Sequence, residues 1–300
     1  MKIVLASLLL SGFLSQARAE VRVTDDAGHT VTLARPARRV ISLAPSVTEM
    51  LFEAGGGDRL VGAVEFSDFP AEALKVPRIG NNQKLDLERI VALKPDLILV
   101  WFHGNATREV DALASLGIPM AHLDPLRIED IPDAIERIGV LIGTEKAAHE
   151  AAQRFRARHA ALRARYADRP AVRVFYQIAD KPLLTINDHQ IISDVLVLCG
   201  GRNVFGKEKQ LVPQLSTESV VAANPDVIVT ARLGAPNGGG QTPVRAPGDS
   251  RLALWARFSE MTAVKRGQLW LIPGDAISRS GPRILDGAQA ICTVIDEARK

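Results

Sequence analysis

The sequence predicts an α/β protein of two lobes, each with a mostly parallel sheet flanked by helices, joined by one long rigid helix. Three observations lead to this prediction: an internal repeat, an alternation of short apolar strands with helices, and one long helical stretch without glycine or proline. With 300 residues, of which 47% are hydrophobic, the chain can bury two cores of about 100–150 residues each.

The repeat joins two segments that lie far apart in the chain. Residues 87–100 (LERIVALKPDLILV) align with residues 217–230 (TESVVAANPDVIVT), which pairs Glu88 with Glu218. Repeats with a fixed period of about 20–50 residues would indicate a solenoid. Because this repeat occurs only once, it predicts two similar lobes that face each other across a ligand-binding cleft. A second pair of similar segments supports the prediction of two lobes: 48–55 (TEMLFEAG) and 193–200 (SDVLVLCG).

The elements of the first lobe follow from hydrophobic periodicity and from turn residues. Alternating residues on both sides of an Asp-Asp-Ala-Gly turn predict an N-terminal hairpin over 21–33. Continuous apolar runs predict buried strands, and glycine or proline ends the helices between them. Strands that alternate with helices imply a mostly parallel sheet covered on both faces. The predicted elements are strands at 39–43, 60–64, 97–101 and 119–123, and helices at 46–54, 85–93 and 110–116.

One stretch breaks this alternation. Residues 144–168 lack glycine and proline, are rich in Ala, Arg and Glu, and begin at Thr144, a suitable N-cap. Such a helix spans about 35 Å, roughly the height of a small domain. Pro170 ends it, and a strand at 172–177 follows. The predicted organisation is an N-terminal lobe over 20–143, a linking helix over 144–168 and a C-terminal lobe over 169–300, with a mobile surface loop at 234–249.

The first nineteen residues predict a signal peptide. Lys2 precedes an apolar run at 3–14, and Ala17-Arg18-Ala19 forms a small-x-small cleavage site. The run is shorter than the about 20 residues that span a bilayer. We therefore expect an exported, soluble and monomeric periplasmic protein. Without Lys2 and Arg18 the formal charge falls from +3 to +1, which gives no electrostatic support for binding nucleic acid or an anionic membrane.

The chain has two cysteines, Cys199 and Cys292. An even count in an exported protein favours a disulfide over free thiols, although the spacing also permits two buried thiols. A bridge that closes so long a loop would contribute up to about 4–5 kcal/mol in the chain-entropy model. Two cysteines alone make no metal site.

Candidate binding residues gather where predicted strands end. In open α/β sheets the ligand binds beyond the carboxyl ends of the strands. Phe66 and Trp101 follow predicted strands, and a large flat ligand would suit such stacking surfaces. His103 and His189 follow predicted strands of opposite lobes and could meet across a cleft, and His103 is a candidate ligand contact. The six histidines form no zinc-binding motif, so no metal site is predicted.

No motif predicts catalysis. The sequence contains no nucleophile elbow, Walker A loop or dinucleotide-binding glycine pattern, so no catalytic residue and no cofactor are expected. Ser46, followed by Glu49 three residues later, is interpreted as a capping box. Glu88 and Glu218 each lie in the first turn of a predicted helix, where a carboxylate complements the helix dipole by about 0.3–1 kcal/mol. Because they recur at equivalent sites of two lobes, they are also candidate docking points for a partner with basic residues.

Several segments together resemble the periplasmic vitamin B12-binding proteins of ABC importers, over nearly the whole mature chain. Some are shared with the wider helical-backbone family that binds iron–siderophores and haem. The tract around Trp101 and the paired cysteines favour the corrinoid branch. The matching segments are 39–49 (RVISLAPSVTE), 66–70 (FSDFP), 85–96 (LDLERIVALKPD), 104–105 (GN), 192–194 (ISD), 198–205 (LCGGRNVF) and 280–284 (SGPRI).

The resemblance implies a class III periplasmic binding protein that holds cobalamin or a related corrinoid between its lobes and delivers it to an inner-membrane permease. The chain differs from a well-known member at Asn82 and Val212, where that member has tryptophans. Two alternatives stay open: a haem- or iron–siderophore-binding protein, which would use His103, His189, Arg279 or Arg283, and an exported enzyme. By position, Phe66, Trp101, Asp275 and Arg279 would contact the corrinoid, Glu88 and Glu218 would pair with permease arginines, and Cys199 would bridge to Cys292.

Overall fold

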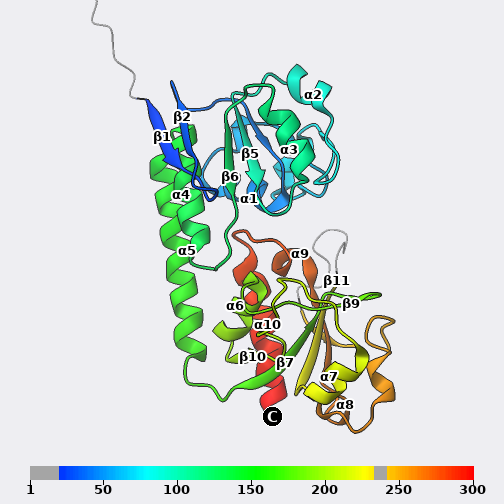
Figure 1. Cartoon of the computed structure of the whole chain (residues 1–300). Helices are drawn as coiled ribbons and strands as arrows, with labels where there is room; N and C mark the ends of the chain where they lie inside the picture. Colours follow the sequence, from blue (N-terminus) through cyan, green and yellow to red (C-terminus); the bar gives the residue numbers. More distant parts are fainter. Residues whose placement is uncertain (1–19, 233–241) are drawn as a thin grey trace, which may run out of the picture.

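The computed structural model describes residues 20–232 and 242–300. The predicted signal peptide over 1–19 and residues 233–241, which include the first part of the loop predicted at 234–249, lie outside this description. Figure 1 shows two lobes, one above the other, beside the long helix α5 (Glu145–Tyr166). The predicted α/β architecture is confirmed. No helix among the described residues has both the length and the apolar composition needed to cross a membrane.

The N-terminal lobe is built on a four-stranded parallel sheet in the order β4-β3-β5-β6. A hairpin of β1 and β2 precedes the sheet, as predicted. The strands are β1 (Val21–Thr24), β2 (Thr30–Leu33), β3 (Val40–Ser42), β4 (Leu60–Ala63), β5 (Leu97–Trp101) and β6 (Met120–Leu123), and the helices are α1 (Pro45–Glu53), α2 (Leu87–Ala92), α3 (Thr107–Ala114) and α4 (Asp130–Ile142), with 3-10 turns at Gly57–Arg59 and Ala71–Lys75.

The C-terminal lobe repeats this arrangement, with the strand order β10-β7-β11-β13 and one antiparallel edge strand, β12, added at the end. β12 lies within the segment predicted as a loop at 234–249. The strands are β7 (Val172–Gln177), β8 (Ala179–Asp180), β9 (Leu183–Leu184), β10 (Gly201–Asn203), β11 (Val227–Arg232), β12 (Val244–Arg245) and β13 (Leu269–Pro273), and the helices are α6 (Ile191–Leu198), α7 (Thr217–Ala223), α8 (Thr262–Lys265), α9 (Gly274–Ile277) and α10 (Ile284–Arg299), with a 3-10 turn at Trp255–Arg257.

The repeated Pro-Asp pair has the same structural role in both lobes. Asp96 accepts hydrogen bonds from the backbone N–H groups of Arg38 and Arg39, and the Arg39 guanidinium donates to the carbonyl of Leu93 at the end of α2. In the C-terminal lobe, Asp226 accepts from the N–H of Arg173, whose guanidinium donates to the carbonyl of Ala223 at the end of α7. The repeat therefore encodes one helix–strand unit that is used twice.

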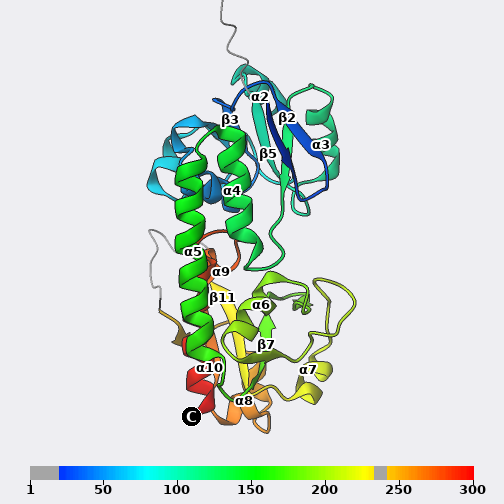
Figure 2. The same ribbon diagram turned by 90° about the vertical axis from the view of Figure 1, so that its left-hand side faces the viewer.

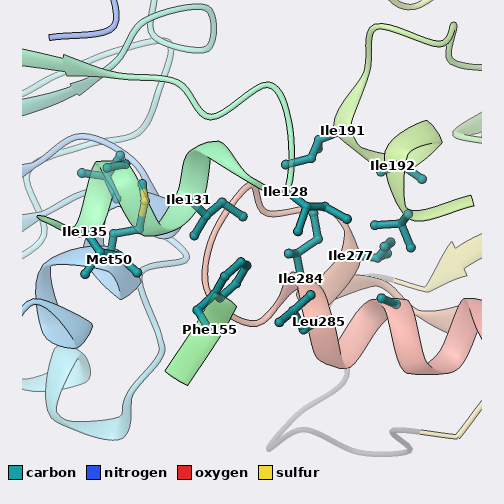
Figure 3. Close-up of a cluster of buried hydrophobic side chains, with 14 of the residues drawn as sticks. Met50, Ile128, Ile131, Ile135, Phe155, Ile191, Ile192, Ile277, Ile284 and Leu285 are labelled. Carbon is teal, nitrogen blue, oxygen red and sulfur yellow. The ribbon is translucent and has the colours of Figure 1, made fainter. Parts of the chain in front are cut away.

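A continuous apolar core joins the two lobes. Met50 and Ile135 of the first lobe belong to the same buried cluster as Ile191, Ile277 and Leu285 of the second. Figure 3 shows this chain of side chains running from α1 and α4, past the linking helix, to α6 and α10. Relative motion of the lobes would break contacts in a close-packed interior, so a stiff hinge is expected.

Helix α4 was not predicted from the sequence. Pro132 and Gly139 interrupt its pattern, but proline is tolerated in a first helical turn, and Gly139 meets a requirement of packing. A Cβ atom added at Gly139 would lie 2.3 Å from the Cβ of Ala148 on α5. Glycine thus permits close contact of α4 with α5, which run side by side in Figure 2.

The linking helix begins and ends close to the predicted bounds, but its N-cap differs in detail. Thr144 occupies the N-cap position, yet its side chain caps no helical N–H. Its hydroxyl instead donates to the carbonyl of Ala54, at 2.6 Å. This contact fastens the start of α5 to the end of α1.

Candidate functional site

The carboxyl ends of both sheets point into the space between the lobes. Glu49, on the helix that follows β3, and Asp68, in the loop that follows β4, both contact Arg279, which follows β13. Ligands of open α/β sheets bind beyond such strand ends. We call the carboxyl ends of β3 to β6, with the loops that follow them, the interlobe face of the N-terminal lobe.

Charged residues form a cluster between the lobes. Arg279 Nη1 lies 3.1 Å from Glu49 Oε1 and 2.7 Å from Asp68 Oδ1, and its Nη2 lies 4.0 Å from Asp275 Oδ1. Arg283 donates to both Glu49 oxygens, at 3.0 and 2.7 Å, and its guanidinium lies 4.1 Å from the ring centre of Phe69. This interlobe ion-pair cluster therefore ties the second lobe to α1 of the first.

Burial makes this cluster energetically important. The side chain of Glu49 is only 2% exposed and that of Arg279 only 12% exposed. Burial alone would lower the pKa of Arg279, but the hydrogen bond and charge of Asp68, followed by those of Glu49, hold that pKa above its ordinary value. Arg279, a predicted ligand contact, is thus charged and already surrounded by carboxylates.

The predicted capping box at Ser46 and Glu49 is wrong. The N-cap of α1 is Ala44, no side chain caps the helix, and Pro45 occupies its first turn. Proline at that position has no N–H to satisfy, and its fixed φ suits a helix start. Glu49 points instead to the arginines of the other lobe. The S-x-x-E pattern is a local signal, whereas the arginines that pair with Glu49 lie 230 and 234 positions away in the chain.

Trp101 ends β5 and is held in place on the interlobe face. Its backbone N–H donates to Asn105 Oδ1 at 2.7 Å, and its indole Nε1 donates to Asp124 Oδ1 at 2.9 Å. The indole lies against Gly104, where an added Cβ atom would come within 1.9 Å of the ring. Only glycine leaves room for the ring, so this turn and the tryptophan depend on each other.

His103 lies beside Trp101 and shares its partner. The imidazole Nδ1 is hydrogen-bonded to Asp124 Oδ2, and the ring packs against Phe102. Asp124 is in turn fixed by its backbone N–H, which donates to Asp26 Oδ2 at 2.7 Å. Burial raises the pKa of Asp26, and the Asp124 N–H and the Arg137 charge partly offset that rise. Asp124, which sequence reasoning missed, therefore positions two predicted site residues.

Phe66 follows β4 and is the most exposed large apolar side chain among the described residues, at 72%. Its φ of +63° lies in the left-handed region, which is uncommon for a residue with a bulky side chain. Such strain persists where the surrounding structure imposes it, and it gathers at functional sites. Phe69, in the same loop, is also exposed. This loop thus presents aromatic rings from the interlobe face.

A cavity of about 460 Å³ adjoins the ion-pair cluster. Phe69, Arg283 and Asp275 line it, together with Arg158 of the linking helix and Asp286 of α10. Of the five predicted ligand contacts, Asp275 lines this cavity. Phe66, Trp101 and His103 lie at the carboxyl ends of β4 and β5, and Arg279 lies in the ion-pair cluster.

Glu88 and Glu218 are both exposed, and each lies in the first turn of a short helix, α2 or α7. A neighbouring side chain, Asp86 or Ser216, caps each helix. Figure 1 shows α2 and α7 on different lobes and on the side away from α5. The two carboxylates thus lie at corresponding positions on the two lobes.

The paired cysteines form the disulfide that was predicted. Cys199, which follows α6, is bonded to Cys292 of α10, and both residues are fully buried. His189 is exposed, and no hydrogen bond or ring contact joins it to His103 among residues 20–232 and 242–300. The expectation that these two histidines meet across the cleft therefore stays a prediction.

One group of side chains has the composition of a metal site. Ligand atoms of Asp25, His29 and His122 lie within 4.8 Å of one another. Asp25, however, already accepts hydrogen bonds from the N–H groups of Ala27 and His29, and from both the N–H and Nδ1 of His122. These hydrogen bonds close the β1–β2 turn and attach it to β6. The three side chains therefore have a structural role that explains why they lie together.

A periplasmic binding protein family model matches residues 40–276, which includes both sheets and the linking helix. The chain belongs to the periplasmic binding protein family. It is 36% identical over 266 residues to the vitamin B12-binding protein of Vibrio cholerae serotype O1 (strain ATCC 39541), covering 88% of this chain and 91% of that protein. It is 38% identical over 259 residues to the vitamin B12-binding protein of Yersinia pestis (strain Pestoides F), covering 86% of each.

Solved structures agree with this assignment. The crystal structure of the periplasmic vitamin B12-binding protein BtuF of Vibrio cholerae matches with a TM-score of 0.78 at 36% identity, over 88% of this chain and 99% of that one. A periplasmic heme-binding protein from Roseiflexus sp. RS-1 matches with a TM-score of 0.73 at 21% identity, over 88% of this chain and all of the other. The second likeness shows the shared fold.

Proposed function

We propose that this periplasmic binding protein captures cobalamin or a related corrinoid between its lobes and delivers it to an ABC importer in the inner membrane. The observation that carries the proposal is the likeness to vitamin B12-binding proteins at 36–38% identity over nearly the whole chain. On this proposal the protein acts by binding and releasing its ligand. It works as a monomer in the periplasm, after removal of the signal peptide over 1–19. No catalytic role is assigned to it.

The interlobe face supports a large flat ligand. Phe66 follows β4 and Trp101 ends β5, and only β3 separates these two strands in the sheet. Strand ends two places apart lie about 10 Å from each other. Two aromatic side chains at that spacing can contact the edge and face of one macrocycle. A haem-binding function is the second candidate, since His103 presents an imidazole on the same face.

The Trp101→Ala variant tests whether this face binds the ligand. Removing a buried aromatic contact at a binding centre costs about 2 kcal/mol, so we expect roughly 30-fold weaker cobalamin binding in calorimetry. Leu116→Ala is the control, because Leu116 is an exposed apolar residue that precedes β6 and so lies at the opposite end of the sheet. Equal affinity of the Trp101→Ala and Leu116→Ala variants would contradict the proposed site.

The Glu88→Arg and Glu218→Arg variants test delivery to the permease. Each carboxylate faces solvent in the free protein and can gain a charge-assisted hydrogen bond to a basic partner. We expect cobalamin affinity to stay unchanged, while binding to the importer falls about tenfold or more for each variant and further for the double variant.

The control for both is Glu150→Arg, an exposed charge reversal on α5. Importer binding is measured in detergent or nanodiscs with the purified permease. If the two glutamates serve only the helix dipole, their variants will bind the importer as the Glu150→Arg variant does.

A further inference from the structure

We propose that His103 Nε2 coordinates the cobalt of the bound corrinoid as an axial ligand, with Asp124 as its positioning residue. This assignment rests on the proposed function, which it deepens by naming the class of corrinoid that binds best. The observation behind it is the hydrogen bond between His103 and Asp124. The histidine side chain is 58% exposed, whereas the aspartate side chain is 6% exposed.

The pair has the arrangement that proteins use to prepare a metal-binding histidine. A ligating imidazole almost always donates its second N–H to a carboxylate or carbonyl, which fixes its tautomer and raises its basicity. Here Nδ1 is bonded to the buried Asp124 carboxylate. The lone pair is therefore on Nε2, and that nitrogen has no hydrogen-bond partner within the described parts of the chain. The exposed imidazole thus keeps one nitrogen available for a ligand.

The position of the imidazole is fixed with respect to the proposed stacking surface. One oxygen of Asp124 accepts from His103 and the other accepts from the Trp101 indole. Asp26 Oδ2 accepts from the Asp124 N–H, and the other Asp26 oxygen is paired with Arg137 Nη2 at 2.5 Å. A chain of polar contacts thus holds both rings at the end of β5. A structural role alone would need neither the exposure of His103 nor a free Nε2.

The chemistry selects among corrinoids. In aquocobalamin the upper axial ligand of Co(III) is a water molecule, which exchanges. Nε2 attacks as the Co–O bond breaks and the Co–N bond forms, water leaves, and cobalt stays Co(III). The Nδ1 proton remains in its hydrogen bond to Asp124. In methylcobalamin the same position holds a carbon ligand that imidazole does not displace. The proposal therefore predicts preference for the aquo form.

Titration of the mature protein with aquocobalamin and with methylcobalamin tests this assignment by absorption and calorimetry. We expect the bands of aquocobalamin to shift to those of its imidazole complex on binding. We also expect its affinity to exceed that of methylcobalamin about tenfold or more. In His103→Ala the shift and the preference should both be lost. His149→Ala, at an exposed histidine of α5, is the control and should retain both.

The Asp124→Asn variant tests whether Asp124 positions His103 for coordination or only stabilises the fold. We expect it to weaken aquocobalamin binding more than methylcobalamin binding, because only the former uses the basicity of Nε2. Equal affinity for the two corrinoids in wild-type protein, with unshifted bands, would overturn the His103 assignment and leave the proposed function standing. Absence of binding to both would overturn the proposed function and this assignment with it.

Discussion

The double variant Cys199→Ala/Cys292→Ala should lose about 4–5 kcal/mol of unfolding free energy, because the bridge closes a loop with a sequence separation of 93. Without the bridge, the unfolded chain gains the conformational freedom of that loop. The bond connects the end of α6 to α10, so it constrains elements of the C-terminal lobe that also contact the core shared by both lobes. Alanine is the suitable replacement, because both cysteines are fully buried and serine would place a polar hydroxyl in the core.

Urea unfolding followed by tryptophan fluorescence and by far-ultraviolet circular dichroism measures this loss. Reducing agent should destabilise the wild-type protein by a comparable amount once unfolding exposes the bridge, and it should leave the double variant unchanged. A loss below about 1 kcal/mol would show that the bridge constrains the unfolded chain far less than loop closure requires.

Glu49→Gln should destabilise the protein by about 3–5 kcal/mol, the cost of removing one partner from a buried ion pair. Glu49 is 2% exposed and holds two arginines of the other lobe. Its loss leaves the charges of Arg279 and Arg283 poorly compensated, although Asp68 and Asp275 still contact Arg279. Because the same cluster joins the lobes, the variant should also loosen their relative position.

Glu53→Gln is a matched control on the same helix. Glu53 is 44% exposed and lies 3.9 Å from Arg154, so it forms a surface pair worth about 0–1 kcal/mol. Thermal or urea unfolding of both variants gives the comparison. A double-mutant cycle of Glu49→Gln with Arg283→Gln isolates the pair itself. Equal stability of the two glutamine variants would show that the interlobe cluster does not stabilise the fold.

Much of the architecture could be predicted because it is encoded in local patterns. Each copy of the Pro-Asp repeat, each apolar strand run and the hairpin turn lies within about fifteen residues, and each forms the kind of element that was predicted. Helix α4 was not predicted because glycine disfavours a helix in sequence, whereas in the structure Gly139 leaves the room that Ala148 of α5 needs.

Only part of the site could be predicted from the sequence, because some of its residues are defined by partners that are distant in the chain. Aromatic residues at strand ends, such as Trp101, can be recognised from the position of the strand. Asp124 and Glu49 have no such signal, because their partners come from elsewhere in the fold. Asp124 lies 21 positions from His103, and Glu49 lies more than two hundred from Arg279. An acidic residue after a strand or inside a helix is ordinary until packing brings its partner near.

The spectrum of the purified mature protein tests the proposed function most directly. The protein is incubated with equal amounts of cobalamin, haem and a ferric siderophore, freed of unbound ligand by gel filtration, and examined by ultraviolet–visible absorption. We predict corrinoid bands at one equivalent per monomer, reduced in the Trp101→Ala variant. Retention of a Soret band with no corrinoid bands would contradict the proposal and assign the interlobe face to haem.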